Sequence, residues 1–368
     1  MDLSPEDNLK LNVLLSQNLQ AVRIDDSKMV VHALTSKGEA RIELNPTLRD
    51  DQYVRQVREF FSTHALGSPG GYPVYLKRWT RMGQAREDKL DSLLILGEPE
   101  AVVAVAHAPG LTEELARRTW WAMPTAEVAR KLLANAQVAR SAIGGELAGF
   151  LLEYLPFETE AAHIIESITR ILTPGLLERE TILALWKRAG RKSAYYVGFI
   201  NAIPDDLPEP GVERADHGQL CSAVPESGPM AQMLRHLSSA AGQQLLLTIN
   251  QAMHKASDQD MVVELLKSIE RYFLPVRPAT EAVVFNCSEQ IDVFVTQPSS
   301  VPQDLAPWGQ QVEAILRLAM VSENLADPVF AQTDAVGSVM RKKLKPVFDW
   351  LSVQIGVLSQ AEFNHTVA

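Results

Sequence analysis

Arginine and tryptophan side chains cluster at two places in the sequence where their types and spacing suggest a binding surface. These two residue types often dominate the energy of protein–protein interfaces, and together they can also stack on nucleic-acid bases and pair with phosphates. Both clusters lie within residues 66–140, which carry a net positive charge, whereas the rest of the chain is net negative. We expect a partner-binding surface formed by Lys77, Arg78, Trp79, Arg81, Arg117, Arg118, Trp120 and Trp121. The alternative is that the tryptophans belong to a core and the arginines extend along helix surfaces.

Cys221 is the one side chain that we consider as a candidate nucleophile. Arg214 precedes it by seven residues and His217 by four. Cationic neighbours lower the pKa of a thiol and favour the reactive thiolate. A sulfur-carrying or nucleophilic role is therefore one interpretation of Cys221, and the other is an ordinary small apolar residue.

No standard catalytic or cofactor motif occurs in the chain. GxGxxG, HExxH and GxSxG are absent, and no zinc-finger spacing is found. Oxygen ligands and one imidazole that could hold a divalent metal are grouped in one acidic stretch, although their spacing matches no known site. We expect that stretch to be a solvated loop, with no metal and no cofactor bound; its residues are Asp205, Asp206, Glu209, Glu213, Asp216 and His217.

The elements that must position these residues begin with a small α+β unit over residues 1–66. Ser4 and Pro5 predict a helix start, and the leucine spacing that follows extends through Leu19. Residues 29–34 and 39–44 predict a β-hairpin around a Thr-Ser-Lys-Gly turn. A helix over about residues 47–64 completes the unit.

After a Gly- and Pro-rich break at residues 67–73, apolar residues recur at helical spacing in one segment after another. Residues 74–203 predict a helical array, 204–229 a Pro-rich acidic loop or linker, and 230–368 a helical region with one β-hairpin at 282–296. We therefore expect a mainly α protein, an irregular, α-solenoid-like array of helical hairpins, with small β-hairpins near both ends that pair in one sheet.

Composition and net charge argue against nucleic-acid binding and against a membrane span. The chain has 368 residues and a net charge of −10, which opposes binding to phosphate backbones. Its two cysteines favour a reducing compartment. The longest uncharged stretch, between His236 and His254, contains serines, glutamines, a threonine and an asparagine, so it does not suit a membrane span. We expect a cytoplasmic protein without membrane insertion.

Three strings of residues resemble a known family. They are YPVYLKRWTRMGQ at residues 72–84, LGEPEAVVAVAHAPGLT at 96–112 and ARRTWWAMP at 116–124. They resemble the DsrS family, whose members are encoded with the dissimilatory sulfite reductase genes of sulfur-oxidising bacteria. The resemblance implies a cytoplasmic accessory of the oxidation of stored sulfur. It transfers no catalytic residue.

Three functions follow as hypotheses. The first is a non-enzymatic accessory or regulatory protein of dissimilatory sulfur oxidation, which binds a protein partner among the sulfur-oxidation proteins through the Arg/Trp residues. The second is a sulfur carrier or sulfurtransferase-like protein that uses Cys221, with Arg214 and His217 favouring its thiolate. The third is an RNA-binding regulator that uses the same Arg/Trp residues.

Overall fold

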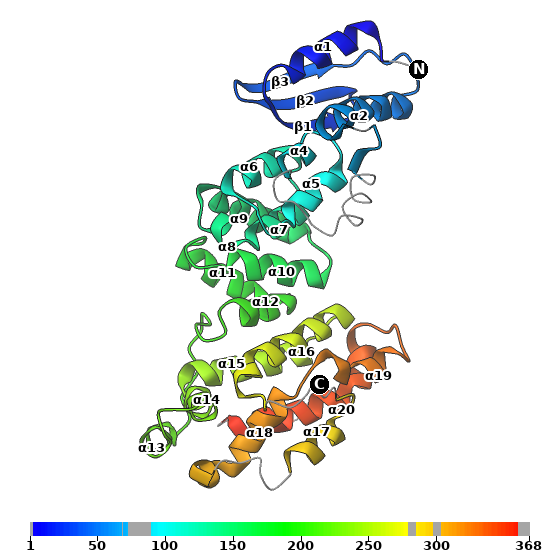
Figure 1. Ribbon diagram of the computed structural model, residues 1–368. Helices are drawn as coiled ribbons and strands as arrows, with labels where there is room; N and C mark the ends of the chain where they lie inside the picture. The colour runs from blue at the N-terminus through cyan, green and yellow to red at the C-terminus, as the bar shows by residue number, and fades with distance from the viewer. Residues whose placement is uncertain (1–2, 68, 73–89, 279–284, 297–302, 360–368) are drawn as a thin grey trace. The chain divides into compact units, whose positions relative to one another are not determined.

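The computed structural model describes residues 3–67, 69–72, 90–278, 285–296 and 303–359. The protein is mostly helical with a small three-stranded antiparallel sheet, as expected from the sequence. The chain divides into two compact units, Met1–Tyr154 and Leu155–Ala368. The predicted boundaries near residues 66–74, 203 and 229 fall inside these units. Figure 1 shows the sheet in the N-terminal part of the first unit and helices in the described residues that follow.

The first unit begins with an α+β arrangement around the sheet. Ser4 Oγ accepts a hydrogen bond from the backbone N–H of Asp7, which confirms the predicted helix start. A hydrophobic core between the two flanking helices and one face of the sheet includes Leu11, Val31, Tyr53 and Phe61. The elements of this part are α1 (Pro5–Leu15), β1 (Leu19–Asp25), β2 (Val30–Thr35), β3 (Gly38–Glu43) and α2 (Asp50–Leu66).

The predicted N-terminal hairpin is confirmed as β2–β3, but the helical spacing that we extended to Leu19 was wrong. Helix α1 ends at Leu15, and Leu19 begins strand β1, which pairs antiparallel with β2. The chain reverses at Asn18, whose φ of 55° lies in the left-handed region that asparagine tolerates better than most residues. Leu19 therefore matches the helical spacing of the preceding leucines only by chance, because it lies in a strand.

Short helices complete the first unit and cover the outer edge of the sheet. The backbone N–H of Val22 in β1 donates to the carbonyl oxygen of Leu94 at 2.8 Å, so this edge of the sheet is not free. The helices are α4 (Leu90–Leu93), α5 (Pro99–Ala106), α6 (Glu113–Ala122), α7 (Ala126–Leu133), α8 (Ala136–Ala139) and α9 (Ala142–Tyr154). Of these, α6 packs against strand β1 as well as against α5, α7 and α9.

The second unit contains only helices in the part that the structure describes. They are η2 (Leu155–Phe157), α10 (Ala161–Ile171), α11 (Arg179–Ala189), α12 (Ala194–Ala202), α13 (His217–Ala223), α14 (Pro229–Ser238), α15 (Ala240–His254), α16 (Gln259–Phe273), η3 (Leu274–Val276), α17 (Ser288–Val295), η4 (Gln303–Trp308), α18 (Gly309–Ala319), η5 (Glu323–Leu325), α19 (Asp327–Phe330) and α20 (Gly337–Leu358). Contacts also join helices distant in sequence, since α15 packs against α20 and α14 against α18.

The second β-hairpin, predicted over residues 282–296, was wrong for its second arm. Ser288–Val295 forms helix α17, and residues 282–284 lie outside the described residues. Ile291 and Val295 are buried one helical turn apart, while Val293 between them is 70% exposed. Asp292 on the same helix accepts hydrogen bonds from Arg317 Nε at 2.7 Å and Trp350 Nε1 at 3.1 Å. These tertiary contacts decide between helix and strand for a short apolar run. The two hairpins therefore do not join in one sheet.

The Pro-rich acidic segment 204–229 packs against its neighbours. The backbone N–H of Arg214 donates to the carbonyl oxygen of Ser238 at 2.9 Å. Leu207 is buried, and the backbone at Gly211 runs so close to α15 that an added Cβ would lie 2.6 Å from the carbonyl oxygen of Ala240. Helix α13 forms inside the segment.

Among the described residues, no helix combines the length and the apolar character that a membrane crossing requires.

Candidate functional site

Helix α6 carries the half of the Arg/Trp group that the structure describes. Thr112 caps its first turn, since its Oγ accepts a hydrogen bond from the backbone N–H of Leu115 at 3.2 Å. The other half of the group, Lys77, Arg78, Trp79 and Arg81, lies outside the described residues.

Trp120 belongs to the interior of the first unit. Its side chain is 8% exposed, and its ring meets that of Phe150 edge to face at 4.9 Å between centroids. Its Nε1 donates to Glu146 Oε1 at 2.7 Å, so the polar edge of the indole is satisfied inside the unit. Trp120 therefore attaches α6 to α9, and only its neighbours on α6 are placed to meet a partner.

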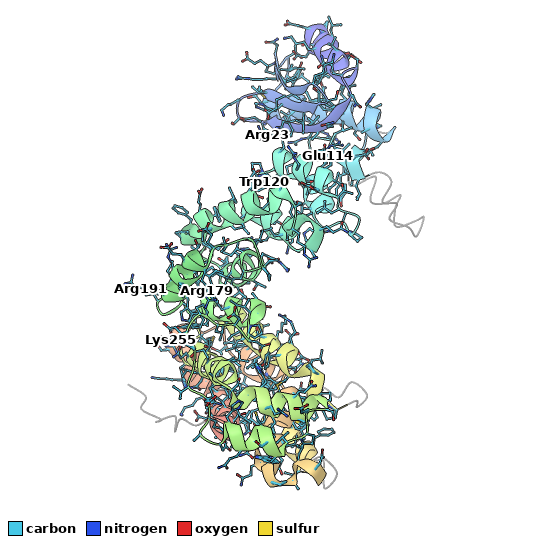
Figure 2. The ribbon with its side chains drawn as sticks, turned by 90° about the vertical axis from the view of Figure 1, so that its left-hand side faces the viewer. Arg23, Glu114, Trp120, Arg179, Arg191 and Lys255 are labelled. Carbon is cyan, nitrogen blue, oxygen red and sulfur yellow. The ribbon has the colours of Figure 1, made fainter. Side chains whose placement is uncertain are left out.

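Trp121 lies at the surface and is held in place from two sides. Its Nε1 donates to Glu39 Oε1 at 2.8 Å, and the Arg23 guanidinium lies 5.2 Å from the centroid of its ring. Arg23 Nη1 also donates to the backbone carbonyl oxygen of Trp121 at 3.3 Å. Figure 2 shows Arg23 at the sheet, near the helix that carries Trp120. The partly exposed Trp121 ring is thus preorganised, with little rotamer freedom left to lose on binding.

The two arginines of α6 differ in their surroundings. Arg118 Nε pairs with Glu114 Oε1 at 2.9 Å, one turn earlier on the helix (labelled in Figure 2). Arg117 is exposed, and no carboxylate of the described residues lies within ion-pair distance of it. Because Arg117 precedes Trp121 by one turn, the two side chains share a face of the helix.

A row of basic side chains crosses the outer face of the sheet beside Trp121. Arg23 lies opposite His32, and His32 lies opposite Arg41, so the three strands each contribute one member. The pKa of His32 is lowered, first by burial and then by the charges of Arg23 and Arg41. The structure thus adds Arg23, His32 and Arg41 to two members of the predicted Arg/Trp group, Arg117 and Trp121. We call these five residues the basic face.

Cys221 lies on helix α13, one turn after His217. Its Sγ is 3.7 Å from Nδ1 and 3.7 Å from Nε2 of His217, and its side chain is half-buried. Arg214 does not reach the thiol, because its Nε and Nη2 form two 2.6 Å bonds to the carboxylate of Asp216. His217 Nδ1 also lies 2.7 Å from Ser238 Oγ. Of the two cations expected near the thiol, the structure places only the imidazole there.

The acidic residues of the 204–229 segment are distributed among separate partners. Asp206 lies 3.7 Å from Arg179, and Asp216 pairs with Arg214. Asp205 lies beside His236. In the described ranges, no three His, Cys, Asp or Glu side chains gather closely enough to hold a metal ion.

A cavity of about 540 Å³ lies between three helices of the second unit, which is within the size range of small-molecule sites. Asp205 follows α12, His236 is on α14, and Tyr272 and Arg271 are on α16. Its lining residues are Ile200, Asn201, Pro204, Asp205, Pro229, Gln232, Met233, His236, Ser268, Arg271, Tyr272 and Pro275.

A hydrogen bond and a short carboxylate–imidazole contact organise the polar side chains around Asp205 in this cavity. Asp205 Oδ1 lies 2.9 Å from His236 Nε2 and accepts a hydrogen bond from the Tyr272 hydroxyl at 3.0 Å. The His236 contact holds the pKa of Asp205 below its usual range, whereas burial raises the pKa of Tyr272. Tyr272 therefore remains a protonated donor, and Asp205 remains a carboxylate.

Sequence reasoning placed Asp205 in an acidic cluster but missed the other polar residues of the cavity. Their signal was weak, because His236, Arg271 and Tyr272 sit on amphipathic helices where polar residues are ordinary. Only the packing of α12, α14 and α16 brings them together.

Comparisons of the chain with family models, with curated proteins and with solved structures find no match.

Proposed function

We propose that this chain is a non-enzymatic, cytoplasmic accessory protein of dissimilatory sulfur oxidation, which acts by binding a protein partner from that system through the basic face. The resemblance of residues 72–84, 96–112 and 116–124 to the DsrS family supplies the biological setting. The structural support is an exposed arginine and an ordered, partly exposed tryptophan one turn apart on α6.

The observation that carries this proposal is the fixed position of Trp121. Interface hot spots are rich in tryptophan and arginine, and a side chain that is already ordered loses little entropy on binding. Trp121 is partly exposed, while Glu39 and Arg23 fix its indole. Arg117, one turn away, is the exposed cation that can reach an acidic residue of the partner.

Affinity purification from sulfur-grown cells of a sulfur-oxidising bacterium tests the proposal. We expect wild type to retain a sulfur-oxidation protein and Arg117→Glu to retain about tenfold less, since loss of a hot-spot arginine costs about 2 kcal/mol or more and a tenfold change corresponds to about 1.4 kcal/mol. Arg140→Glu is the matched control, because Arg140 is also exposed in the first unit but lies at the end of α8. Equal retention by both variants, or retention of no sulfur-oxidation protein, would refute the proposal.

A sulfur carrier is the second candidate function, and the contact between Cys221 and His217 favours it. Protonated His217, 3.7 Å from Sγ, would stabilise a thiolate. The thiolate would attack the outer sulfur of a persulfide donor, which leaves as a thiolate while Cys221 becomes the persulfide. Mass spectrometry after incubation with a persulfide donor should show one added sulfur atom on Cys221 and less of it in His217→Gln. An unmodified Cys221 would exclude this function.

A further inference from the structure

The cavity between α12, α14 and α16 holds one carboxylate and one guanidinium that face a shared space. Asp205 uses Oδ1 for both His236 and Tyr272, and no hydrogen bond or ion pair from the described residues engages its Oδ2. The Asp205 side chain is 60% exposed, so Oδ2 can accept a hydrogen bond from a bound molecule. This side of the cavity suits a cationic donor.

Arg271 and Asn201 offer hydrogen-bond donors that suit an anionic group of a ligand. Asn201 Oδ1 accepts hydrogen bonds from Ser268 Oγ at 2.6 Å and from Arg271 Nη1 at 3.1 Å. Because Asn201 Oδ1 faces Ser268 and Arg271, the Asn201 amide nitrogen points away from these two residues. The other nitrogens of Arg271 form no hydrogen bond to the described residues. A guanidinium with free N–H groups beside an amide donor suits a carboxylate.

Apolar side chains complete the cavity. Ile200, Met233, Pro229 and Pro275 form much of its wall. An uncharged ligand in this space would displace water from Asp205 Oδ2 and from the free Arg271 nitrogens without replacing its hydrogen bonds, which is costly. A ligand with one net charge would satisfy one of the two residues and be repelled by the other.

We propose that this cavity binds a zwitterionic amino acid with an apolar side chain, with its ammonium group on Asp205, its carboxylate on Arg271 and Asn201, and its side chain against Ile200 and Met233. Tyr272 and His236 act as positioning residues, because each holds the bound oxygen of Asp205 and leaves the other oxygen for the ligand. This site is independent of the basic face and does not rest on the proposed function.

Isothermal titration calorimetry on the full chain tests the site with L-leucine and L-methionine as probes. Two analogues of leucine each remove one charge: leucinamide lacks the carboxylate, and 4-methylpentanoate lacks the amine. We expect the amino acids to bind and each analogue to bind at least about tenfold more weakly, since each analogue loses the hydrogen bonds that one charged group makes.

Variants assign each charge to its residue. Asp205→Asn should weaken leucine binding but strengthen the weak binding of 4-methylpentanoate, because it removes the charge that repels this anion. Arg271→Gln should likewise weaken leucine binding but strengthen that of the cation leucinamide. Asp206→Asn and Arg191→Gln are matched controls, because both residues are exposed in the same unit and neither lines the cavity (Arg191 is labelled in Figure 2). Both controls should bind leucine as wild type does.

Three results would overturn the proposal. The first is the absence of binding by leucine and methionine at millimolar concentration. The second is an analogue that binds as tightly as leucine, because the cavity would then recognise a single charge. The third is leucine binding that neither Asp205→Asn nor Arg271→Gln weakens, because the ligand would then bind elsewhere.

Discussion

The guanidinium of Arg23, on the first strand, lies 5.2 Å from the ring centroid of Trp121, on α6. Ninety-eight positions of sequence separate the two residues, and the Arg23 bond to the Trp121 carbonyl oxygen crosses the same gap. Sheet and helix are thus joined by a pair that also shapes the surface of the first unit.

The first prediction concerns this pair. Arg23→Met keeps the aliphatic stem and removes the charge, so we expect the free energy of unfolding to fall by about 0.5–1 kcal/mol, the range of a surface cation–π contact. In a double-mutant cycle with Trp121→Leu, measured by urea denaturation, the two changes should be less than additive. Full additivity would show that Arg23 and Trp121 do not interact.

The second prediction concerns a buried hydroxyl in the first core. The Tyr53 hydroxyl donates to Asp7 Oδ2 at 2.5 Å, and both residues are fully buried. Tyr53→Phe should lower the free energy of unfolding by about 1–3 kcal/mol, because Asp7 loses a hydrogen bond that water cannot replace. Tyr154→Phe, at a position that is 41% exposed, is the control and should change stability by no more than about 0.5 kcal/mol. Comparable losses in both variants would contradict this account.

The third prediction concerns the pKa of His32. Burial and the flanking charges of Arg23 and Arg41 lower it, so an NMR titration should place its midpoint below about 6.5. Arg41→Gln should raise this midpoint, since it removes one of the two positive charges. A midpoint that does not move in Arg41→Gln would mean that the row of charges does not set the pKa.

The same shift makes stability depend on pH in a defined direction. Because the folded-state pKa of His32 is depressed, the unfolded chain binds its proton first. The contribution of His32 to stability is therefore complete above about pH 6.5 and is lost as pH falls through the folded-state pKa. His32→Gln should flatten the stability profile in that interval, which denaturation at a series of pH values would measure.

The fourth prediction concerns the close approach of α10 and α12. A Cβ added at Gly198 would lie 2.5 Å from Ile168 Cγ2, and Ile168 is fully buried. Gly198→Ala should cost about 1–3 kcal/mol of stability through overpacking. Gly218→Ala, on α13 with open space around the new Cβ, should instead stabilise by up to about 1 kcal/mol. Thermal unfolding of both variants measures the difference, and opposite signs are the expected outcome.

Local sequence patterns predicted the correct secondary structure where the residues of one short segment decide it. Ser4 and Pro5 fixed the first helix start, and the alternation of residues 39–44 fixed strand β3. Local patterns predicted the wrong secondary structure where contacts with a segment distant in the sequence decide it. Leu19 continues a leucine spacing yet belongs to β1 because β2 lies beside it, and Ile291–Val295 alternates like a strand yet is helical because α18 and α20 provide partners for Asp292.

The two candidate sites also differ in whether the sequence alone could predict them. The Arg/Trp group was visible in the sequence because its members are neighbours along the chain. The cavity was not, since Asp205, His236 and Tyr272 come from three segments. Only helix packing brings His236 Nε2 to 2.9 Å and the Tyr272 hydroxyl to 3.0 Å from Asp205 Oδ1.

By itself, the sequence determined the helical class of this protein, its net negative charge with one positive region, and the residue types on α6. The tertiary structure alone decided that Trp120 is interior and Trp121 exterior, and that a carboxylate, an imidazole and a phenol share one cavity. The physical reason is that helix propensity and charge are properties of neighbouring residues, whereas burial and hydrogen-bond partnership depend on surfaces that meet only after the chain has folded.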